Sequence, residues 1–461
     1  MADKRAWDIV VYGATGFTGR LVSQYLAKHA PSGMRIAIAG RSESKLLALR
    51  STLDTSSDER VSPRTPEDIG VIVADALDEP RIRELARDTR VVIAAAGPFA
   101  KYGTPLARAA AHAGTHYADI TGEAPWVRTV IDELHDTARS SGALLIPMSG
   151  FDSVPADLGA FFTVQQMRKR RGSGVRAIRA YARTRGGGMS GGTIASAVNM
   201  MSDAAASKTG ADPLCMVPES LGRAADLAVA GGAAAGAPGT GAVMPLADRW
   251  WFDWREEVSA YAVPWPMEAV NTRCVRRSAA LAAAAGSPWS GAGEPFAYTE
   301  WATTSRWQTA ATSAIGGVVF RLLLGLPYAT SLLAPLLPKP GTGPSDDAMA
   351  KASFEYTFVA EPSGRRSAAM PGAPSAGAAA SSDSRPLTTK LRGAIDPYLA
   401  TAVFVSQAAL AMAADDAEAL PGMVQGGGVL TPATALGDAL LRRLQATGQF
   451  DFSVEGDETA A

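Results

Sequence analysis

The stretch WDIVVYGATGFTG, residues 7–19, decides how the N-terminal region folds. Its β-branched run from Trp7 to Tyr12 predicts a buried strand that ends at a glycine. Apolar residues then recur at helical spacing between Leu21 and Leu26. The stretch therefore predicts a strand, a tight glycine-rich turn and a helix in direct succession.

Three glycines occupy the turn between this strand and this helix. Gly13 permits the tight turn, Gly16 lets the backbone approach a pyrophosphate, and Gly19 allows close packing of helix on strand. Free N–H groups and the helix dipole favour phosphate charge at this end of the helix. The turn predicts a dinucleotide site; the alternative is a strand–helix turn without a ligand. The predicted cofactor-binding residues are Gly13, Ala14, Thr15, Gly16, Phe17, Thr18 and Gly19.

Strand and helix patterns alternate over residues 7–150 with short turns between them. Further strands are predicted at residues 35–40, 71–74, 91–95, 115–119 and 143–147. The run at 91–95 is apolar throughout, as expected for a strand covered on both faces. Regular alternation with right-handed crossovers predicts an α/β fold whose N-terminal domain, residues 1–150, is a Rossmann doubly wound parallel sheet.

The end of the second predicted strand decides which dinucleotide is preferred. An NAD site uses a carboxylate there, but this chain has Arg41 and Ser42, and its nearest acid is Glu43. A guanidinium offers a planar fork to a 2′-phosphate, and a serine hydroxyl can donate as well. We therefore expect NADP(H) as the cofactor; the alternative is that Arg41 is only a solvated residue at a helix start.

Other residues at the carboxyl ends of the predicted strands face the same crevice, because open α/β sheets bind ligands at that edge. Asp75 is expected near the adenine, or else as a turn residue. Near the ribose and nicotinamide we expect Gly97, Pro98 and Phe99, with a core position as the alternative for Phe99.

Composition excludes several classes of protein. The 461 residues include 44 Lys+Arg and 45 Asp+Glu, so net charge gives no attraction to nucleic acid. Two cysteines cannot build a disulfide framework, and the N-terminal apolar run is too short for a signal peptide, so we expect a cytoplasmic, unsecreted protein. All four histidines precede residue 136, which removes hydrolase and zinc sites; no metal is expected.

Beyond residue 150 the pattern is weaker. Residues 151–394 are expected to form a second α/β domain with low-complexity surface insertions at 203–245 and 361–387. A strand is predicted at 175–184 and a helix at 193–206. Residues 395–461 are predicted as C-terminal helices, with a short strand at 449–454.

One apolar segment, residues 314–337, carries a single charge, Arg321, and prolines at 327 and 335. The arginine and prolines argue against a straight transmembrane helix. Two interpretations stay open: a buried core or dimer segment, or an apolar hairpin lying at a membrane surface.

Several segments together resemble the saccharopine dehydrogenase-like oxidoreductase family. They are VVYGATGFTGRLV, AIAGRSESKL, VVIAAAGPFAKYG, GTHYADITGE, GFDSVPADLG, LLPKPGTGPS and GGVLTPATALG. The resemblance implies an NADP-binding Rossmann domain, a second α/β mixed-sheet domain for substrate and dimer contacts, and C-terminal elements that pack back on the first domain. The family includes saccharopine reductases and trans-acting enoyl reductases of glycolipid assembly, and its eukaryotic members associate with lipid droplets or membranes.

Together these features predict an NADP(H)-dependent oxidoreductase that moves hydride to or from an apolar, lipid-like carbonyl or enoyl substrate. The alternatives are a saccharopine reductase and a non-catalytic nucleotide-binding protein at a lipid surface. Expected partners are a small-molecule or lipid substrate, a lipid-droplet or membrane surface, and a second copy of the chain in a homodimer. The candidate proton donors or orienting residues near the nicotinamide are Lys101, Tyr102, Glu123 and Asp152.

Overall fold

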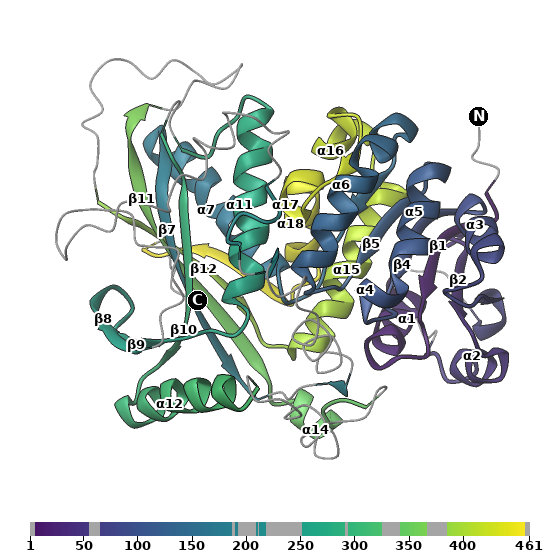
Figure 1. The fold of residues 1–461 in the computed structure, drawn as a ribbon, viewed down its shortest axis with the longest axis horizontal. Helices are drawn as coiled ribbons and strands as arrows, with labels where there is room; N and C mark the ends of the chain where they lie inside the picture. Colours follow the sequence, from purple (N-terminus) through teal and green to yellow (C-terminus); the bar gives the residue numbers. More distant parts are fainter. Residues whose placement is uncertain are drawn as a thin grey trace.

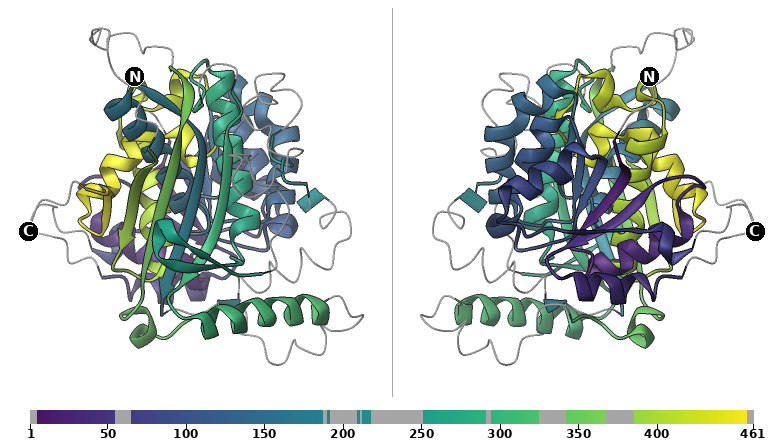
Figure 2. Two further views of the ribbon diagram at one scale, coloured as in Figure 1. Left: turned by 90° about the vertical axis from the view of Figure 1, so that its left-hand side faces the viewer. Right: turned by 90° about the vertical axis from the view of Figure 1, so that its right-hand side faces the viewer.

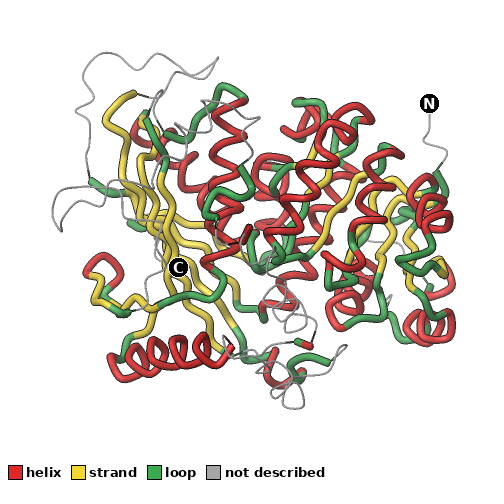
Figure 3. Tube along the Cα trace, viewed as in Figure 1, coloured by secondary structure: helices red, strands yellow, loops and turns green. Residues whose placement is uncertain are grey.

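Two β-sheets stand side by side, with helices between and around them (Figure 1). The computed structural model describes residues 5–54, 65–186, 190–191, 209–210, 212–217, 251–290, 294–324, 342–366 and 385–456. Figure 3 shows the strands in yellow as two separate groups. The predicted pairing of a Rossmann sheet with a second, mixed sheet is confirmed.

The first sheet has seven parallel strands in the order β13-β6-β5-β4-β1-β2-β3. Its order reverses at β1, which lies between β4 and β2. Such a reversal point is where doubly wound sheets bind nucleotides. The strands are β1 (Trp7–Tyr12), β2 (Ile36–Gly40), β3 (Gly70–Val73), β4 (Thr89–Ala94), β5 (His116–Asp119), β6 (Leu144–Ile146) and β13 (Gly428–Val429).

Helices cover both faces of this sheet. Ile9 and Val11 of β1 belong to one buried cluster with α1 and α15, whereas Val10 and Tyr12 belong to another with α3, α5 and α6. The alternation follows from the period of two along a strand. The helices are α1 (Phe17–His29), α2 (Glu43–Arg50), α3 (Glu79–Arg87), α4 (Phe99–Tyr102), α5 (Thr104–Ala113), α6 (Ala124–Ser141) and α15 (Pro397–Ala414).

The second sheet is mixed, with the order β14-β12-β11-β7-β10-β9-β8. Its β7 and β10 pair in parallel, and its other pairs are antiparallel. Helices α7 (Val154–Arg171) and α11 (Glu268–Ala284) pack against it. The strands are β7 (Ser173–Arg185), β8 (Asp253–Arg255), β9 (Ala260–Val263), β10 (Ala297–Thr304), β11 (Ser353–Arg366), β12 (Leu387–Gly393) and β14 (Phe450–Val454).

The C-terminal segment contributes to both sheets. Its helix α15 packs against α1, β4 and β5, β13 extends the first sheet, and β14 forms one edge of the second. The first sheet therefore extends beyond residue 150. The remaining short helices are α14 (Asp346–Met349), α16 (Pro421–Val424), α17 (Pro432–Ala435) and α18 (Gly437–Ala446).

Two predicted surface insertions differ from the structure. Strand β11 runs on to Arg366, so the segment predicted from 361 begins as sheet. Within 203–245, Cys215 and Met216 are buried, and Arg277 donates to the Met216 carbonyl at 2.7 Å. Composition did not indicate these packed residues, because Ala, Gly, Ser and Pro dominate both segments. The helix predicted at 193–206 lies outside the described residues.

The apolar segment predicted at 314–337 overlaps a helix that begins earlier, α12 (Trp307–Leu324). Figure 2 shows α12 lying across the lower end of the molecule, apart from the other helices. Ala314 is buried and Ile315 is exposed, while residues 325–341 lie outside the described chain. Its attachment to a membrane surface stays a prediction. Among described residues, only α15 has the length and hydropathy to span a membrane, and 78% of that window is buried, as in a core helix.

Candidate cofactor and active site

Two glycines beside the turn, Gly13 and Gly19, leave no room for a side chain. A Cβ atom at Gly19 would lie 2.2 Å from the Gly13 carbonyl oxygen, and one at Gly13 would lie 2.7 Å from the Ala96 nitrogen. Gly13 also has a φ of +82°, which favours glycine. These close approaches bring the N-terminus of α1 directly over the ends of β1 and β4.

The N-terminus of α1 is open to an anion. Gly16 is the N-cap, no described side chain caps the helix, and the first turn contains no acidic residue. The backbone N–H groups there lack helical acceptors, and the helix dipole favours negative charge. The residues present therefore fit the pyrophosphate of a dinucleotide. Those that would hold it are Gly13, Ala14, Thr15 and Gly16 of the turn and Thr18 and Gly19 at the start of α1.

Phe17 in the same turn is used for packing. Its ring meets the Tyr398 ring edge-on at a centroid distance of 5.3 Å, and a Cβ atom at Gly343 would lie 2.3 Å from Phe17 Cζ. The Tyr398 hydroxyl accepts a hydrogen bond from the Ser190 backbone N–H at 2.6 Å. Phe17 thus packs against Tyr398 and Gly343 beside the phosphate turn, and Tyr398 in turn binds Ser190.

The residues predicted to lie near the adenosine stand where β2 and β3 end. Arg41 is exposed and Ser42 is half-buried, with Asp75 exposed on the neighbouring strand end. Asp75 Oδ1 accepts the Leu77 backbone N–H at 2.9 Å, so this carboxylate also shapes its own turn. Burial, and secondarily the charge of Asp75, raises the pKa of Tyr12 to about 12, while Arg41 opposes that shift.

A buried carboxylate fixes the loop that follows β4. Glu123 accepts the backbone N–H of Phe99 at 2.8 Å on Oε1 and that of Ala100 at 2.9 Å on Oε2. Both carboxylate oxygens therefore act as acceptors at the start of α4, which favours an orienting role for Glu123. Phe99 is buried against Trp126, while Gly97 is exposed and Pro98 half-buried just before it.

Lys101 and Tyr102 lie next to each other on the short helix α4. Lys101 is exposed and Tyr102 is half-buried. The Lys101 ammonium lies 5.3 Å from the centre of the Tyr102 ring. This contact directs the lysine along the surface of α4, so of the two only Tyr102 is withdrawn from solvent.

The loops after β5 and β6 are joined by Asp119. Its Oδ1 accepts the backbone N–H groups of Thr121 and Met148, each at 3.0 Å, and burial raises its pKa to about 7. The Thr401 hydroxyl on α15 accepts the Phe151 N–H at 3.0 Å. These contacts hold the segment that carries Asp152 against the rest of the first sheet.

Asp152 differs from these bonded carboxylates. It is half-buried, and it makes no hydrogen bond or ion pair with another described residue. Burial alone raises its pKa to about 6. A Cβ atom at Gly122 would lie 3.6 Å from Asp152 Oδ2 and 4.0 Å from Val270 of α11. Asp152 therefore lies where the strand ends of the first sheet meet the second domain.

A buried acid on the second sheet was missed by sequence reasoning. Glu300 of β10 is 2% exposed and accepts hydrogen bonds from Asn271 Nδ2 at 2.7 Å, the Tyr298 hydroxyl at 2.9 Å and the Tyr356 hydroxyl at 3.4 Å. Burial raises its pKa to about 7. The only available signal was the alternation of Tyr298 and Glu300, which puts both on one face of a strand.

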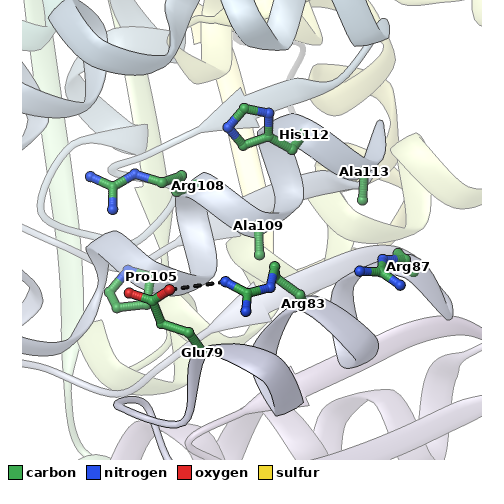
Figure 4. A pocket seen from close by; sticks show the side chains of 8 residues that line it. All are labelled: Glu79, Arg83, Arg87, Pro105, Arg108, Ala109, His112 and Ala113. Carbon is green, nitrogen blue, oxygen red and sulfur yellow. Dashed lines mark hydrogen bonds and ion pairs between the residues drawn. The ribbon is translucent and has the colours of Figure 1, made fainter.

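A groove of about 500 Å³ lies between α3 and α5, and Figure 4 shows the side chains that line it. Arg83, Arg87, Arg108 and His112 line it, with Glu79 paired to Arg83 at 2.9 Å. None of the predicted site residues lines this groove. Among the residues that the structure describes, no group of three or more His, Cys, Asp or Glu could hold a metal ion.

Comparison with known proteins agrees with this arrangement. Residues 9–146 match the saccharopine dehydrogenase NADP binding domain family. The apo saccharopine dehydrogenase (L-Glu forming) of Saccharomyces cerevisiae has a similar fold, with a TM-score of 0.50 over 97% of this chain and 99% of that one at 12% identity.

The similarity to proteins of related sequence extends over nearly the whole chain. A Mycobacterium tuberculosis protein is 34% identical over 461 residues, covering 97% of each chain, and is provisionally named a trans-acting enoyl reductase. A trans-acting enoyl reductase of Mycobacterium ulcerans is 32% identical and covers 96% of this chain and 97% of its own. This chain therefore belongs to the saccharopine dehydrogenase-like family and is an NAD(P)-binding oxidoreductase.

Proposed function

We propose that the protein is an NADPH-dependent enoyl reductase that saturates the α,β-double bond of an apolar acyl thioester made by a separate enzyme. Support comes from relatives named trans-acting enoyl reductases, which match 96% or more of this chain. The observation that carries the proposal is the unbonded, half-buried Asp152 at the same strand edge as the open N-terminus of α1.

When bound, the cofactor supplies hydride for the β-carbon of the substrate. The chain must then supply a proton to the α-carbon, because hydride addition leaves an enolate. Asp152 suits this role because its pKa of about 6 lets it carry a proton near neutral pH, and no described residue competes for its oxygens. Its O–H bond breaks as the new C–H bond forms, which leaves the Asp152 carboxylate.

Cofactor preference is proposed from Arg41. Its exposed guanidinium stands at the end of β2, where a 2′-phosphate of NADP would lie. Ser42 adjoins it, and the Ser42 hydroxyl lies 3.4 Å from that of Ser44 at the start of α2. The positive charge at this strand end favours NADP over NAD.

The test is NADPH oxidation by the full-length protein with medium-chain and long-chain enoyl thioesters, analysed for the saturated product. We expect turnover in the wild type and a loss of about 100-fold or more in kcat for Asp152→Asn, with NADPH affinity retained. Tight NADPH binding without reduction of any thioester would support the non-catalytic alternative. Oxidation of saccharopine with NADP would support the amino-acid dehydrogenase alternative.

A further inference from the structure

The groove between α3 and α5 shares no lining residue with the predicted cofactor site, and it is basic. Its basic side chains come in equal number from the two helices: Arg83 and Arg87 from α3, and Arg108 and His112 from α5 (Figure 4). All four are exposed. Glu79 is the one acid that lines the groove in the part of the chain that the structure describes. The groove therefore carries an excess of positive charge that the proposed reduction does not use.

The two basic side chains on each helix are four residues apart in the sequence. At a rise of about 1.5 Å per residue, they lie on one face of their helix and about 6 Å apart along the groove. Carboxylates four residues apart on another helix have the same separation. An acidic helix laid along the groove can thus pair with both basic side chains of either wall, whereas a single inorganic phosphate spans only part of that length.

Between the basic side chains, small apolar residues line the groove. Pro105, Ala109 and Ala113 follow one another at intervals of four along α5, and Ala109 is buried. Small-molecule sites are concave and direct a few polar groups at one ligand, but here the charges stand along two rims with an apolar strip between them. This arrangement is typical of a groove that receives a helix of another protein.

The arginines of the groove can exchange partners, because their ion pairs lie at the surface. Arg83 pairs with Glu79 and Arg108 with Glu133 of α6, each at 2.9 Å, and all four side chains are at least 46% exposed. Pairs this exposed contribute little to stability, so a carboxylate of a partner can replace either acid. Arg87 forms no hydrogen bond or ion pair with another described residue.

One end of the groove reaches the edge of the first sheet where the cofactor is expected. Glu79 and Pro105 lie in the first turns of α3 and α5, and both helices follow the carboxyl ends of parallel strands. Thr104, the first residue of α5, accepts the Trp126 indole N–H at 3.0 Å, and Trp126 packs on Phe99 at the start of α4. A protein docked along the groove therefore lies next to the strand edge where the reduction is proposed to occur.

We propose that this groove docks an acidic helix of the protein that carries the acyl thioester to be reduced. The docking site rests on the proposed function and deepens it, because it assigns the surface that receives the partner. The helix lies along the groove with Asp or Glu side chains four residues apart facing the arginines. Attraction between these charges steers the two proteins together and fixes the orientation of the partner, so that its thioester is presented at the strand edge.

The binding test needs neither cofactor nor substrate. A fluorescent helical peptide with Glu at every fourth position is titrated with the full-length protein at low salt, beside a peptide with Gln at those positions. We expect the Glu peptide to bind at least about tenfold more tightly, and Arg87→Glu and Arg108→Gln each to weaken its binding at least about threefold. The matched control is Lys169→Glu, which reverses an exposed charge on α7 and should leave binding unchanged.

Two outcomes of this titration would overturn the docking site. One is equal binding of the Glu and Gln peptides, or binding that neither groove variant changes. The other is calorimetric binding of inorganic phosphate that Arg87→Glu abolishes, without binding of the Glu peptide, which would make the groove a site for a small anion.

A kinetic test separates docking from catalysis. One enoyl chain is supplied either as a free N-acetylcysteamine thioester or on a small acidic acyl carrier protein. We expect Arg87→Glu to raise the KM for the protein-bound thioester about tenfold or more and to leave kcat and the reduction of the free thioester unchanged. Equal losses with both substrates would overturn the docking site. If the peptide binds as expected but the wild type reduces neither thioester, the enoyl substrate is wrong and the acidic-helix site stands.

Discussion

Alanine at Gly19 and alanine at Gly16 should have different effects on stability, although both residues belong to the phosphate turn. At Gly19 the new Cβ would lie 2.2 Å from the Gly13 carbonyl oxygen, and real Cβ contacts essentially never fall under 3.0 Å. Strand end and helix start must therefore separate by about 0.8 Å. Since both sides of the contact are backbone, neither can rotate away, and we expect a loss of about 3 kcal/mol in the free energy of unfolding.

At Gly16 the same atom meets the Gly13 oxygen at 3.3 Å and the Ala95 oxygen at 3.9 Å. A movement of a few tenths of an ångström accommodates it, so the free energy of unfolding should change by less than about 1 kcal/mol. The Cβ would nevertheless stand at the N-cap of α1, where a pyrophosphate must approach the backbone. We expect NADPH affinity to fall at least about tenfold, or about 1.4 kcal/mol.

Urea unfolding of the cofactor-free protein gives the stability, and NADPH fluorescence titration gives the affinity. Gly33→Ala is the control: Gly33 has a φ of +78° and open space around it. That variant should lose about 1 kcal/mol of stability through backbone strain alone and bind NADPH normally. Wild-type affinity in Gly16→Ala, or wild-type stability in Gly19→Ala, would refute the account of this turn.

Three further predictions concern the ends of the site and its acids. Arg41→Ala should weaken NADP binding about tenfold or more and leave NAD binding unchanged in parallel titrations; equal effects on both cofactors would rule out a 2′-phosphate contact. Glu123→Gln should lower the free energy of unfolding by about 2 kcal/mol in urea, because Phe99 and Ala100 then share one acceptor oxygen. Glu300 should make folding less stable as pH rises from 4.5 toward about 7, since the folded protein keeps a proton that the unfolded chain has released. Between about pH 5 and about pH 8 this group should account for up to about 3 kcal/mol of the loss in the free energy of unfolding, so Glu300→Gln should lose that much less than the wild type over the same interval.

The first sheet could be predicted because its information is local. Each strand run ends at a glycine or a turn, and the helix that follows has its own period, so β1 to β6 appeared within a few residues of their bounds. Local sequence patterns likewise indicated the glycine turn, Arg41 and the loop that carries Asp152. The sequence could not predict which carboxylates accept hydrogen bonds from backbone N–H groups, because those bonds depend on how the loops after different strands pack together.

The second sheet carries little local information. Strands β10 and β11 are separated by α12 and by residues outside the described chain, yet both contribute to the environment of Glu300. Composition also misled within the predicted insertion at 203–245, where residues 212–217 are held by arginines of α11. Arg273 donates to the Asp212 carbonyl at 3.0 Å and Arg276 to the Pro213 carbonyl at 3.2 Å. Such contacts link residues about 60 positions apart, beyond the reach of any periodicity.

The bonding of each carboxyl separates two roles that an active site of this kind must combine, which are holding its loops and transferring a proton. Glu123 and Asp119 accept backbone N–H groups and so hold the loops after β4, β5 and β6 in place. An oxygen that accepts backbone N–H groups in this way is occupied as an acceptor and is poorly placed to hold the proton that a substrate takes up. Asp152 lies in the loop after β6, next to the loops that Glu123 and Asp119 hold, and no described residue forms a hydrogen bond with its carboxyl. Because other residues hold these loops in place, loss of the proton from Asp152 changes the charge of this side chain but does not release the loop that positions it.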